Sequence, residues 1–169
     1  MIIDLASLLD RTIANLHFDS TLSTKSIEVG GREIFFNKPI EVTVDIYRAD
    51  WSIYLDGMVT YEYTESCARC LKEFNKEVKG NLFGRLIEKN KDFNEDDVEE
   101  DVIYYKGDTL DLTEDVISAV VLSLPMKSIC SEDCKGLCPL CGKDLNKGKC
   151  DCVIEEIDPR LVKLKDFFE

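Results

Sequence analysis

The sequence predicts an α+β fold in which an antiparallel β meander, barrel-like in its curvature, is covered by one main helix. One observation behind this prediction is the alternation of apolar and polar residues in 39–48 and again in 52–64, a pattern typical of strands with one buried face. A second is an amphipathic helix pattern at Leu112–Leu124. The third is a C-terminal cysteine-rich module, since six of the eight cysteines lie between Cys130 and Cys152.

The first elements follow from local patterns in the first 64 residues. We expect a short strand at Ile2–Leu5 and a helical turn at Ser7–Arg11. The short link Ala49-Asp50-Trp51 between the two alternating segments predicts an antiparallel hairpin. The inward positions expected on this hairpin are Ile40, Val42, Val44, Ile46, Ile53, Leu55, Val59, Tyr61 and Tyr63.

Two further strands are predicted after a turn that carries Cys67 and Cys70. The first has apolar residues on even spacing, namely Phe74, Val78, Leu82 and Leu86. Gly80 and Gly84 interleave with them and indicate a bulge or a strongly bent strand. A short strand at Val102–Tyr105 follows, closed by the turn Gly107-Asp108.

A block of acidic residues separates these two strands. Residues 92–101 contain seven acids and no base, which is typical of a solvated loop. The alternative interpretation is an acidic arm that mimics phosphate and docks on a basic partner.

The main helix has sequence signals at both ends. Asp111 and Glu114 have capping-box spacing, and Pro125 ends the helix. Its apolar stripe consists of Leu112, Val116, Ile117, Val120, Val121 and Leu124. A short terminal helix is predicted from Asp158 as N-cap and Pro159 at the first helical position. We therefore divide the chain into an α+β domain at 1–126 and a cysteine-rich module at 127–169.

The net charge of −13 restricts the class of partner. With 34 acids against 21 bases, the chain lacks the cations that general nucleic-acid binding requires. A basic protein partner fits this charge, and a local basic patch is still compatible with it. Whether RNA is contacted directly does not follow from the composition.

The cysteines are expected to bind metal in a reducing cytosol. The N-terminus has no basic segment followed by an apolar run, and no segment reaches the roughly 18 apolar residues of a membrane span. We therefore expect a cytoplasmic protein without a membrane segment, in which thiols ligate metal. The alternative in an oxidising compartment is a disulfide scaffold.

The spacing of the C-terminal cysteines predicts a zinc knuckle. Cys138-Pro139-Leu140-Cys141-Gly142 provides two thiolates in a tight turn, and Gly142 permits the positive φ that the turn needs. Cys150 and Cys152 complete a tetrathiolate after a polar loop. We assign site 1 to Cys138, Cys141, Cys150 and Cys152.

A second zinc site is predicted from the remaining cysteines. Site 2 would combine Cys67 and Cys70 with Cys130 and Cys134, and would attach the C-terminal module to the β meander. A different partition, in which Cys130 and Cys134 join Cys138 and Cys141, is left open by the spacing. Two structural Zn²⁺ ions are expected, because eight thiols make two sets of four and all-thiolate sites are usually closed.

The sequence offers little for catalysis. Its only histidine, His17, lies far from the cysteine motifs and is expected at the surface or a boundary. Neither a phosphate-binding loop nor a dinucleotide fingerprint is present. We therefore expect no enzyme activity and no small-molecule substrate.

Several motifs resemble one known family. The segment Cys67-Ala68-Arg69-Cys70-Leu71 after a β meander resembles the C-x-R-C-L element of the YceD-like family, the large ribosomal RNA subunit accumulation proteins. The resemblance extends to its cysteine-rich, zinc-binding branch. Further similar motifs are Leu122-Ser123-Leu124-Pro125, Gly136-Leu137-Cys138-Pro139-x-Cys141-Gly142-x-x-Leu145-Asn146, and Cys150-x-Cys152 followed by Asp158-Pro159-Arg160.

This resemblance implies a non-enzymatic factor needed for large-subunit ribosomal RNA to accumulate. It further implies a bacterial assembly factor that binds a ribosomal protein or a pre-ribosomal large-subunit particle. Family members that lack most of the C-terminal cysteines favour a structural role for the cluster. The functional role would then belong to the shared sheet and the Cys67–Cys70 tip.

Two other functions are compatible with the cysteines. A redox-switched chaperone would release zinc when the C-x2-C and C-x-C thiolates are oxidised to disulfides. An iron-bearing electron carrier is the weaker alternative, since CPxCG also occurs in rubredoxin-like sites.

Overall fold

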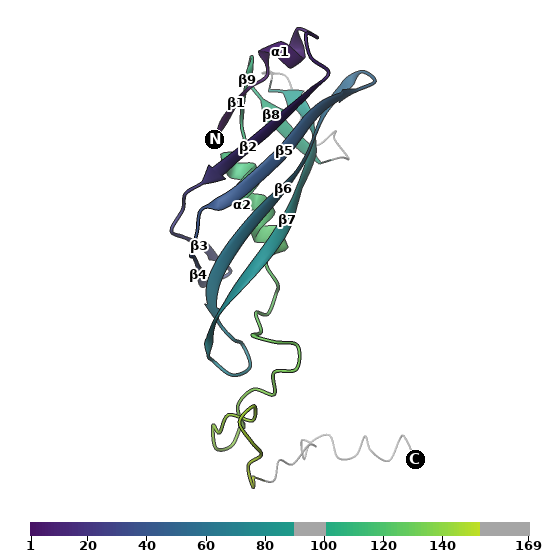
Figure 1. Cartoon of the computed structure of the whole chain (residues 1–169). Coiled ribbons are helices and arrows are strands. Elements are labelled where there is room, and N and C mark those ends of the chain that lie inside the picture. The colour runs from purple at the N-terminus through teal and green to yellow at the C-terminus, as the bar shows by residue number, and fades with distance from the viewer. Residues whose placement is uncertain (90–100, 153–169) are drawn as a thin grey trace, which may run out of the picture. The chain divides into compact units, whose positions relative to one another are not determined.

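The computed structural model describes residues 1–89 and 101–152 (Figure 1). Of the acidic segment 92–101, only Asp101 is among the described residues. The predicted terminal helix from Asp158 lies outside them. Neither helix in the described ranges is long and apolar enough to cross a membrane.

The chain is divided into two compact units. Unit 1 consists of Met1–Glu65 and Glu73–Met126, and unit 2 of Ser66–Lys72 and Lys127–Glu169. The turn with Cys67 and Cys70 therefore belongs to the same unit as the C-terminal cysteines. The chain passes between the units at three places, so unit 2 is covalently linked to unit 1 by three segments.

Unit 1 is built on a mostly antiparallel sheet whose central strand is β6 (Ser52–Ser66). Strand β5 (Ile40–Ala49) pairs with it in antiparallel register from Ala49↔Ser52 to Glu41↔Thr60, which confirms the predicted hairpin. All nine predicted inward residues of the hairpin are buried. Their alternation with exposed residues explains why these strands were visible in the sequence.

Three N-terminal strands extend this sheet and were not predicted. Strand β2 (Asn15–Leu22) pairs with β5, whereas β3 (Ser26–Val29) and β4 (Arg32–Phe36) form a hairpin whose second strand pairs with the far end of β6. Strand β2 carries half-buried residues at every second position, so a period-two signal was present there.

The other edge of β6 pairs with β7 (Glu73–Glu88), which carries β8 (Val102–Tyr105) beyond it. Strand β8 is parallel to β7, which departs from the predicted antiparallel meander. In the described ranges β2 and β8 are not paired, so the sheet is open and the barrel-like expectation is wrong. A short separate pair joins β1 (Ile2–Asp4) to β9 (Thr109–Asp111).

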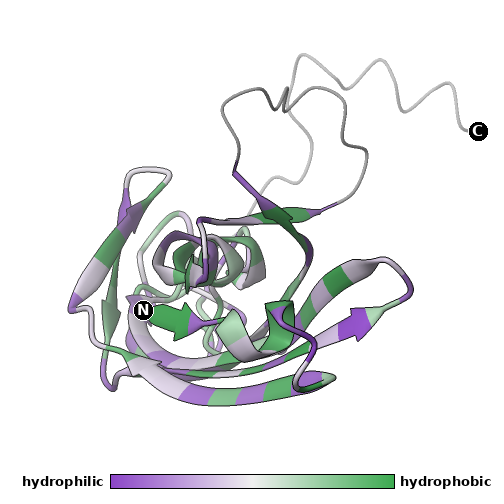
Figure 2. Cartoon of the chain, turned by 90° about the horizontal axis from the view of Figure 1, so that it is seen from above, coloured by the Kyte–Doolittle hydropathy of each residue, from purple (hydrophilic) through white to green (hydrophobic). Residues whose placement is uncertain are grey.

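Helix α2 (Thr113–Ser123) covers the inner face of the sheet, which curves around it in Figure 2. Gly80 of β7 makes this close packing possible, since a Cβ there would lie 3.0 Å from the Ala119 carbonyl oxygen and 2.9 Å from Val59 Cγ2. A short helix, α1 (Ala6–Leu9), buries Leu8 in the same core. Among the described residues, the main hydrophobic core lies entirely in unit 1.

The start of α2 differs from the predicted capping box. The N-cap residue is Leu112, whose side chain is fully buried, and it makes no side-chain cap. Asp111 instead accepts hydrogen bonds through Oδ1 from the backbone N–H of Thr113 at 3.0 Å and from its hydroxyl at 2.6 Å. The helix therefore begins one residue later than predicted. The predicted stripe is also narrower, because Val121 is exposed.

Candidate metal centre

The first cysteine pair lies in a tight turn between β6 and β7. The backbone N–H of Leu71 donates to the carbonyl of Cys67 at 2.8 Å, and the N–H of Cys67 donates to the carbonyl of Lys72 at 2.8 Å. The N–H of Arg69 points at the Cys67 sulfur at 3.4 Å. This is the hydrogen-bond pattern of a knuckle, in which the backbone directs two sulfurs to the same side.

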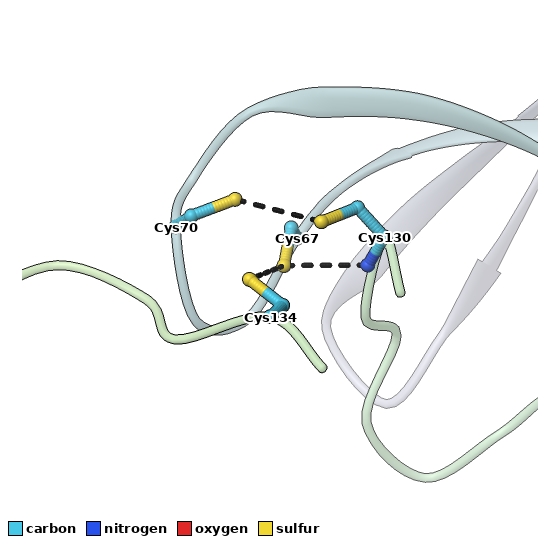
Figure 3. Close-up of side chains that lie close together, drawn as sticks. All are labelled: Cys67, Cys70, Cys130 and Cys134. Carbon is cyan, nitrogen blue, oxygen red and sulfur yellow. Dashed lines mark hydrogen bonds between the residues drawn. The ribbon is translucent and has the colours of Figure 1, made fainter. Parts of the chain in front are cut away.

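The second pair, Cys130 and Cys134, lies in a loop that folds onto this turn (Figure 3). The N–H of Ala68 donates to the carbonyl of Ser128 at 2.8 Å, and the N–H of Cys130 donates to the Cys67 sulfur at 3.4 Å. All four sulfurs lie within 4.8 Å of one another. The structure thus groups Cys130 and Cys134 with the hairpin turn rather than with the later cysteines.

Two of the sulfur–sulfur distances of site 2 match the edge of a metal tetrahedron. Cys70 Sγ lies 3.7 Å from Cys130 Sγ, and Cys67 Sγ lies 3.9 Å from Cys134 Sγ. A regular tetrahedron with metal–sulfur bonds of about 2.3 Å has edges of about 3.8 Å. Disulfide bonds are about 2.05 Å long, and all eight cysteines are free here.

The second group of cysteines repeats the knuckle. The N–H of Gly142 donates to the carbonyl of Cys138 at 2.9 Å, and the N–H of Cys138 donates to the carbonyl of Lys143 at 2.8 Å. Gly142 has a φ of 71°, as its predicted role requires. The sulfurs of Cys138, Cys141, Cys150 and Cys152 also lie within 4.8 Å of one another.

The electrostatics of site 2 differ strongly between its thiols. Burial raises the pKa of Cys67, but the backbone N–H groups of Cys130, Cys70 and Arg69 outweigh it and bring that pKa to about 6. The side chain of Cys134 raises the pKa of Cys130 to about 12. Without a cation, this cluster favours one thiolate and resists the ionisation of the last thiol.

Site 1 has the same asymmetry. Backbone N–H groups of Cys141 and Leu140 lower the pKa of Cys138 to about 6, whereas the Cys141 side chain raises the pKa of Cys152 to about 12. A bound metal cation removes this conflict, because a coordinating thiol is deprotonated outright. Each group of four cysteines can therefore hold one metal ion.

Arg69 connects the two halves of site 2. Its Nη1 donates to the carbonyl oxygens of Glu132 at 3.1 Å and of Cys134 at 2.8 Å, so the guanidinium fixes the Cys130–Cys134 loop against the turn. Gly136 packs directly on this residue, since a Cβ there would lie 2.8 Å from the Arg69 carbonyl oxygen. Groups behind the ligands orient them in this way in metal sites generally.

Asn146 and Asp144 link site 2 to the loop of site 1. The Asn146 amide nitrogen lies 3.6 Å from the Cys134 sulfur and 2.9 Å from Asp144 Oδ1. The Lys72 ammonium, 2.5 Å from Asp144 Oδ2, together with the N–H of Asn146 lowers the pKa of Asp144 to about 2. The two sites thus share a polar network within unit 2.

Comparison with known proteins places the chain in a family. A family model described as "Large ribosomal RNA subunit accumulation protein YceD" matches residues 55–168. This chain belongs to the YceD family. The match includes all eight cysteines, so both candidate metal groups lie within the family region.

Individual relatives agree with this assignment. "Large ribosomal RNA subunit accumulation protein YCED homolog 1, chloroplastic" of Arabidopsis thaliana is 29% identical over 146 residues, covering 71% of this chain and 46% of that protein. An uncharacterized protein of Mycobacterium tuberculosis is 34% identical over 112 residues, covering 66% of this chain and 54% of that protein. The chain thus spans about half the length of these relatives. No solved structure matches.

Sequence reasoning overlooked the residues that support the YceD cysteines. Arg69 and Gly136 were quoted only as parts of motifs, although each had a detectable signal. An arginine inside a C-x2-C turn and a glycine two residues before the next knuckle both indicate close packing around the ligands. His17 lies outside the family match and is exposed on β2, 2.7 Å from Asp45 and 3.2 Å from Asp19.

Proposed function

We propose that this chain is a non-enzymatic factor in assembly of the large ribosomal subunit and is needed for its ribosomal RNA to accumulate. It acts by binding a ribosomal protein or a pre-ribosomal large-subunit particle. The observation that carries this proposal is the YceD family match over residues 55–168. The printed names of the Arabidopsis thaliana and Zea mays relatives refer to the same process.

The charge of the chain supports a basic partner. Its formal net charge is −13 at pH 7, and each tetrathiolate with Zn²⁺ carries a formal charge of −2. Ribosomal proteins are strongly basic as a class, so attraction over a Debye length would increase the rate at which they encounter this chain.

The two metal ions are proposed to be structural Zn²⁺. The donor sets support this assignment, because both consist of four thiolates. A four-coordinate zinc held by them would have no open coordination position for a substrate. The described residues of unit 2 supply nothing to the main hydrophobic core, so the fold of this part depends on other interactions. Zinc would provide them, as it does in small domains that fold only with metal.

Depletion of the protein in the organism that produces it tests the function. We expect large-subunit ribosomal RNA to fall relative to small-subunit RNA, and the tagged chain to co-sediment with large-subunit precursors. Re-expression of the wild-type chain should restore the ratio. If the RNA ratio is unchanged on depletion and the chain sediments alone, the proposal is wrong.

A redox-switched chaperone remains the second candidate because two ligands are accessible. Cys130 and Cys141, one in each group, are exposed to solvent. Peroxide could therefore reach one sulfur of each site and release its metal. Peroxide treatment followed by zinc release and by protection of an unfolded client from aggregation would favour this function. Metal retention under peroxide would contradict it.

A further inference from the structure

One hollow of unit 1 has a charge opposite to that of the whole chain. It has a volume of about 450 Å³ and lies where the β5–β6 hairpin meets α1, β7 and β8. Three arginines line it, Arg11, Arg48 and Arg85, and no carboxylate does. Because acids exceed bases by 13 in this chain, such a lining is not a consequence of composition.

Two of these arginines form no ion pair with the residues that the structure describes. Arg48 donates from Nη2 to the carbonyl of Leu8 at 2.9 Å, and its buried Nε has no hydrogen-bond partner among the described residues. Arg11 is exposed, and its guanidinium forms no ion pair or hydrogen bond with the described part of the chain. Asp50 is the one acid that lines the adjoining hollow, which also contains Arg11 and Arg48. Among the described residues, no carboxylate therefore pairs with Arg11 or Arg48, and the exposed guanidinium of Arg11 can contact an anionic ligand directly.

An exposed tryptophan stands at the same place. Trp51, the only tryptophan of the chain, occupies the hairpin turn and is 92% exposed. Its indole makes no ring contact with any aromatic residue that the structure describes. An indole in water is unfavourable, and a planar aromatic ligand would bury its face.

The combination selects one class of ligand. Guanidinium groups bind phosphate in a bidentate manner, and aromatic side chains stack on unpaired bases. An acidic peptide would use the arginines but would leave the indole in water. We propose that this hollow binds a nucleotide of single-stranded RNA, with its phosphate at Arg11 and Arg48 and its base on Trp51.

This inference deepens the proposed function and rests on it for the choice of RNA. It also reconciles an acidic protein with RNA contact, because binding would be confined to this hollow. The low number of phosphate contacts would make the salt dependence shallow, with a slope of about −0.7 per phosphate contacted.

The experiment uses the fluorescence of Trp51, which reports on base stacking without a label. The purified full-length, metal-loaded chain is titrated with a short oligouridylate at low salt. We expect saturable quenching. Arg11→Asn should weaken binding about fivefold or more, and asparagine suits the φ of 61° at this position, so the variant should fold. Lys79 is an exposed residue of β7 outside the hollow, and Lys79→Gln removes the same charge as Arg11→Asn. It should leave the affinity for RNA within about twofold of wild type.

Trp51→Leu is measured with labelled RNA by anisotropy, because the intrinsic signal is lost. Its affinity should fall about fivefold or more. The proposal is overturned if both variants bind like wild type, or if oligoglutamate or inorganic phosphate quenches Trp51 as strongly as RNA does. It is also overturned if RNA fails to bind while the chain still co-sediments with large-subunit precursors, a result that leaves the proposed function intact.

Discussion

Leu71 occupies in the first knuckle the backbone position that Gly142 occupies in the second. Their φ angles are 60° and 71°, and their N–H groups donate to the first cysteine of each knuckle at 2.8 and 2.9 Å. A left-handed conformation costs a residue with a side chain about 1–2 kcal/mol. The hairpin knuckle therefore retains a strained leucine where the C-terminal knuckle has the glycine expected from the sequence.

Substitutions at these two positions should have unequal effects. Gly142→Ala should lower the free energy of unfolding of unit 2 by about 1 kcal/mol, although a Cβ there meets no atom within 4 Å. Leu71→Asn should be neutral or stabilising, because asparagine tolerates this φ. Chemical denaturation of the metal-loaded chain measures both. Equal destabilisation by the two variants would show that contacts, rather than backbone conformation, decide the outcome.

Metal content should be two Zn²⁺ per chain, and each site should be lost separately. Cys67→Ser is expected to remove about one equivalent and Cys138→Ser the other, because the sulfurs form two separate groups of four. Elemental analysis after exhaustive dialysis measures the stoichiometry. Ser131, which lies between Cys130 and Cys134, provides the control. The Ser131→Ala variant should retain both ions. A single shared ion would contradict the grouping.

Removal of metal should unfold unit 2 and leave unit 1 folded. The buried apolar side chains in the described part of unit 2 are those of Cys67, Cys70, Cys134 and Cys138, whereas the main core of the described residues lies in unit 1. A chelator under reducing conditions should therefore make backbone amides of 66–72 and 127–152 exchange rapidly with solvent, while those of β5 and β6 stay protected. Hydrogen exchange with peptide resolution measures this. Loss of protection throughout the sheet would show that the sites stabilise the entire fold.

Arg69 should affect site 2 selectively. Arg69→Lys removes the guanidinium, whose Nη1 bridges the carbonyls of Glu132 and Cys134, and such supporting residues typically contribute 10- to 100-fold to metal affinity. Competition with a chromophoric chelator should therefore show that one Zn²⁺ is bound with lower affinity and that the affinity for the other is unchanged. Lys143→Gln is the matched variant at site 1, where the ammonium donates to the Lys149 carbonyl. If Arg69→Lys lowers the Zn²⁺ affinity of both sites equally, the two sites are more strongly coupled than the grouping suggests.

The sequence predicted the parts of this fold where one residue type decides the structure. Alternation predicted β5 and β6 closely, and Asp50 at a φ of 52° forms the predicted tight turn. The spacing of the C-terminal cysteines grouped Cys138, Cys141, Cys150 and Cys152, and the second group consisted of the cysteines that remained; the structure brings each group together. The alternation of the strands is a local signal. The cysteine groups follow from the four thiolates that a tetrahedral zinc site needs.

What the sequence did not predict depends on distant packing. The parallel pairing of β8 with β7 and the open edge of the sheet follow from chain routing, which no local pattern encodes. The capping box was displaced because the N-cap is Leu112, one residue after Asp111, although Asp111 still accepts from the backbone N–H of Thr113. Membership of the turn 66–72 in unit 2 likewise required three-dimensional contacts.

Gly80 should be intolerant of any side chain. In Gly80→Ala the new methyl would lie 2.9 Å from both Val59 Cγ2 and Ser123 Oγ, and 3.0 Å from the backbone oxygen of Ala119, so α2 would have to move. Overpacking of this kind typically costs 1–3 kcal/mol. Thermal unfolding of the metal-loaded chain measures the loss. Asn81→Ala, at the next and exposed position, is the control and should change stability by less than about 0.5 kcal/mol.

His17 gives unit 1 a small pH-dependent contribution to stability. The hydrogen bond with Asp45, followed by that with Asp19, raises the pKa of His17 above 6.5. Because the folded value is raised, the contribution is fully present below the unfolded pKa and disappears as pH rises through the folded value. Since His17 is the only histidine, its proton resonances can be titrated without assignment ambiguity. Asp45→Asn should lower its pKa more than Asp19→Asn does, and an unshifted His17 in the wild-type chain would contradict the pairing.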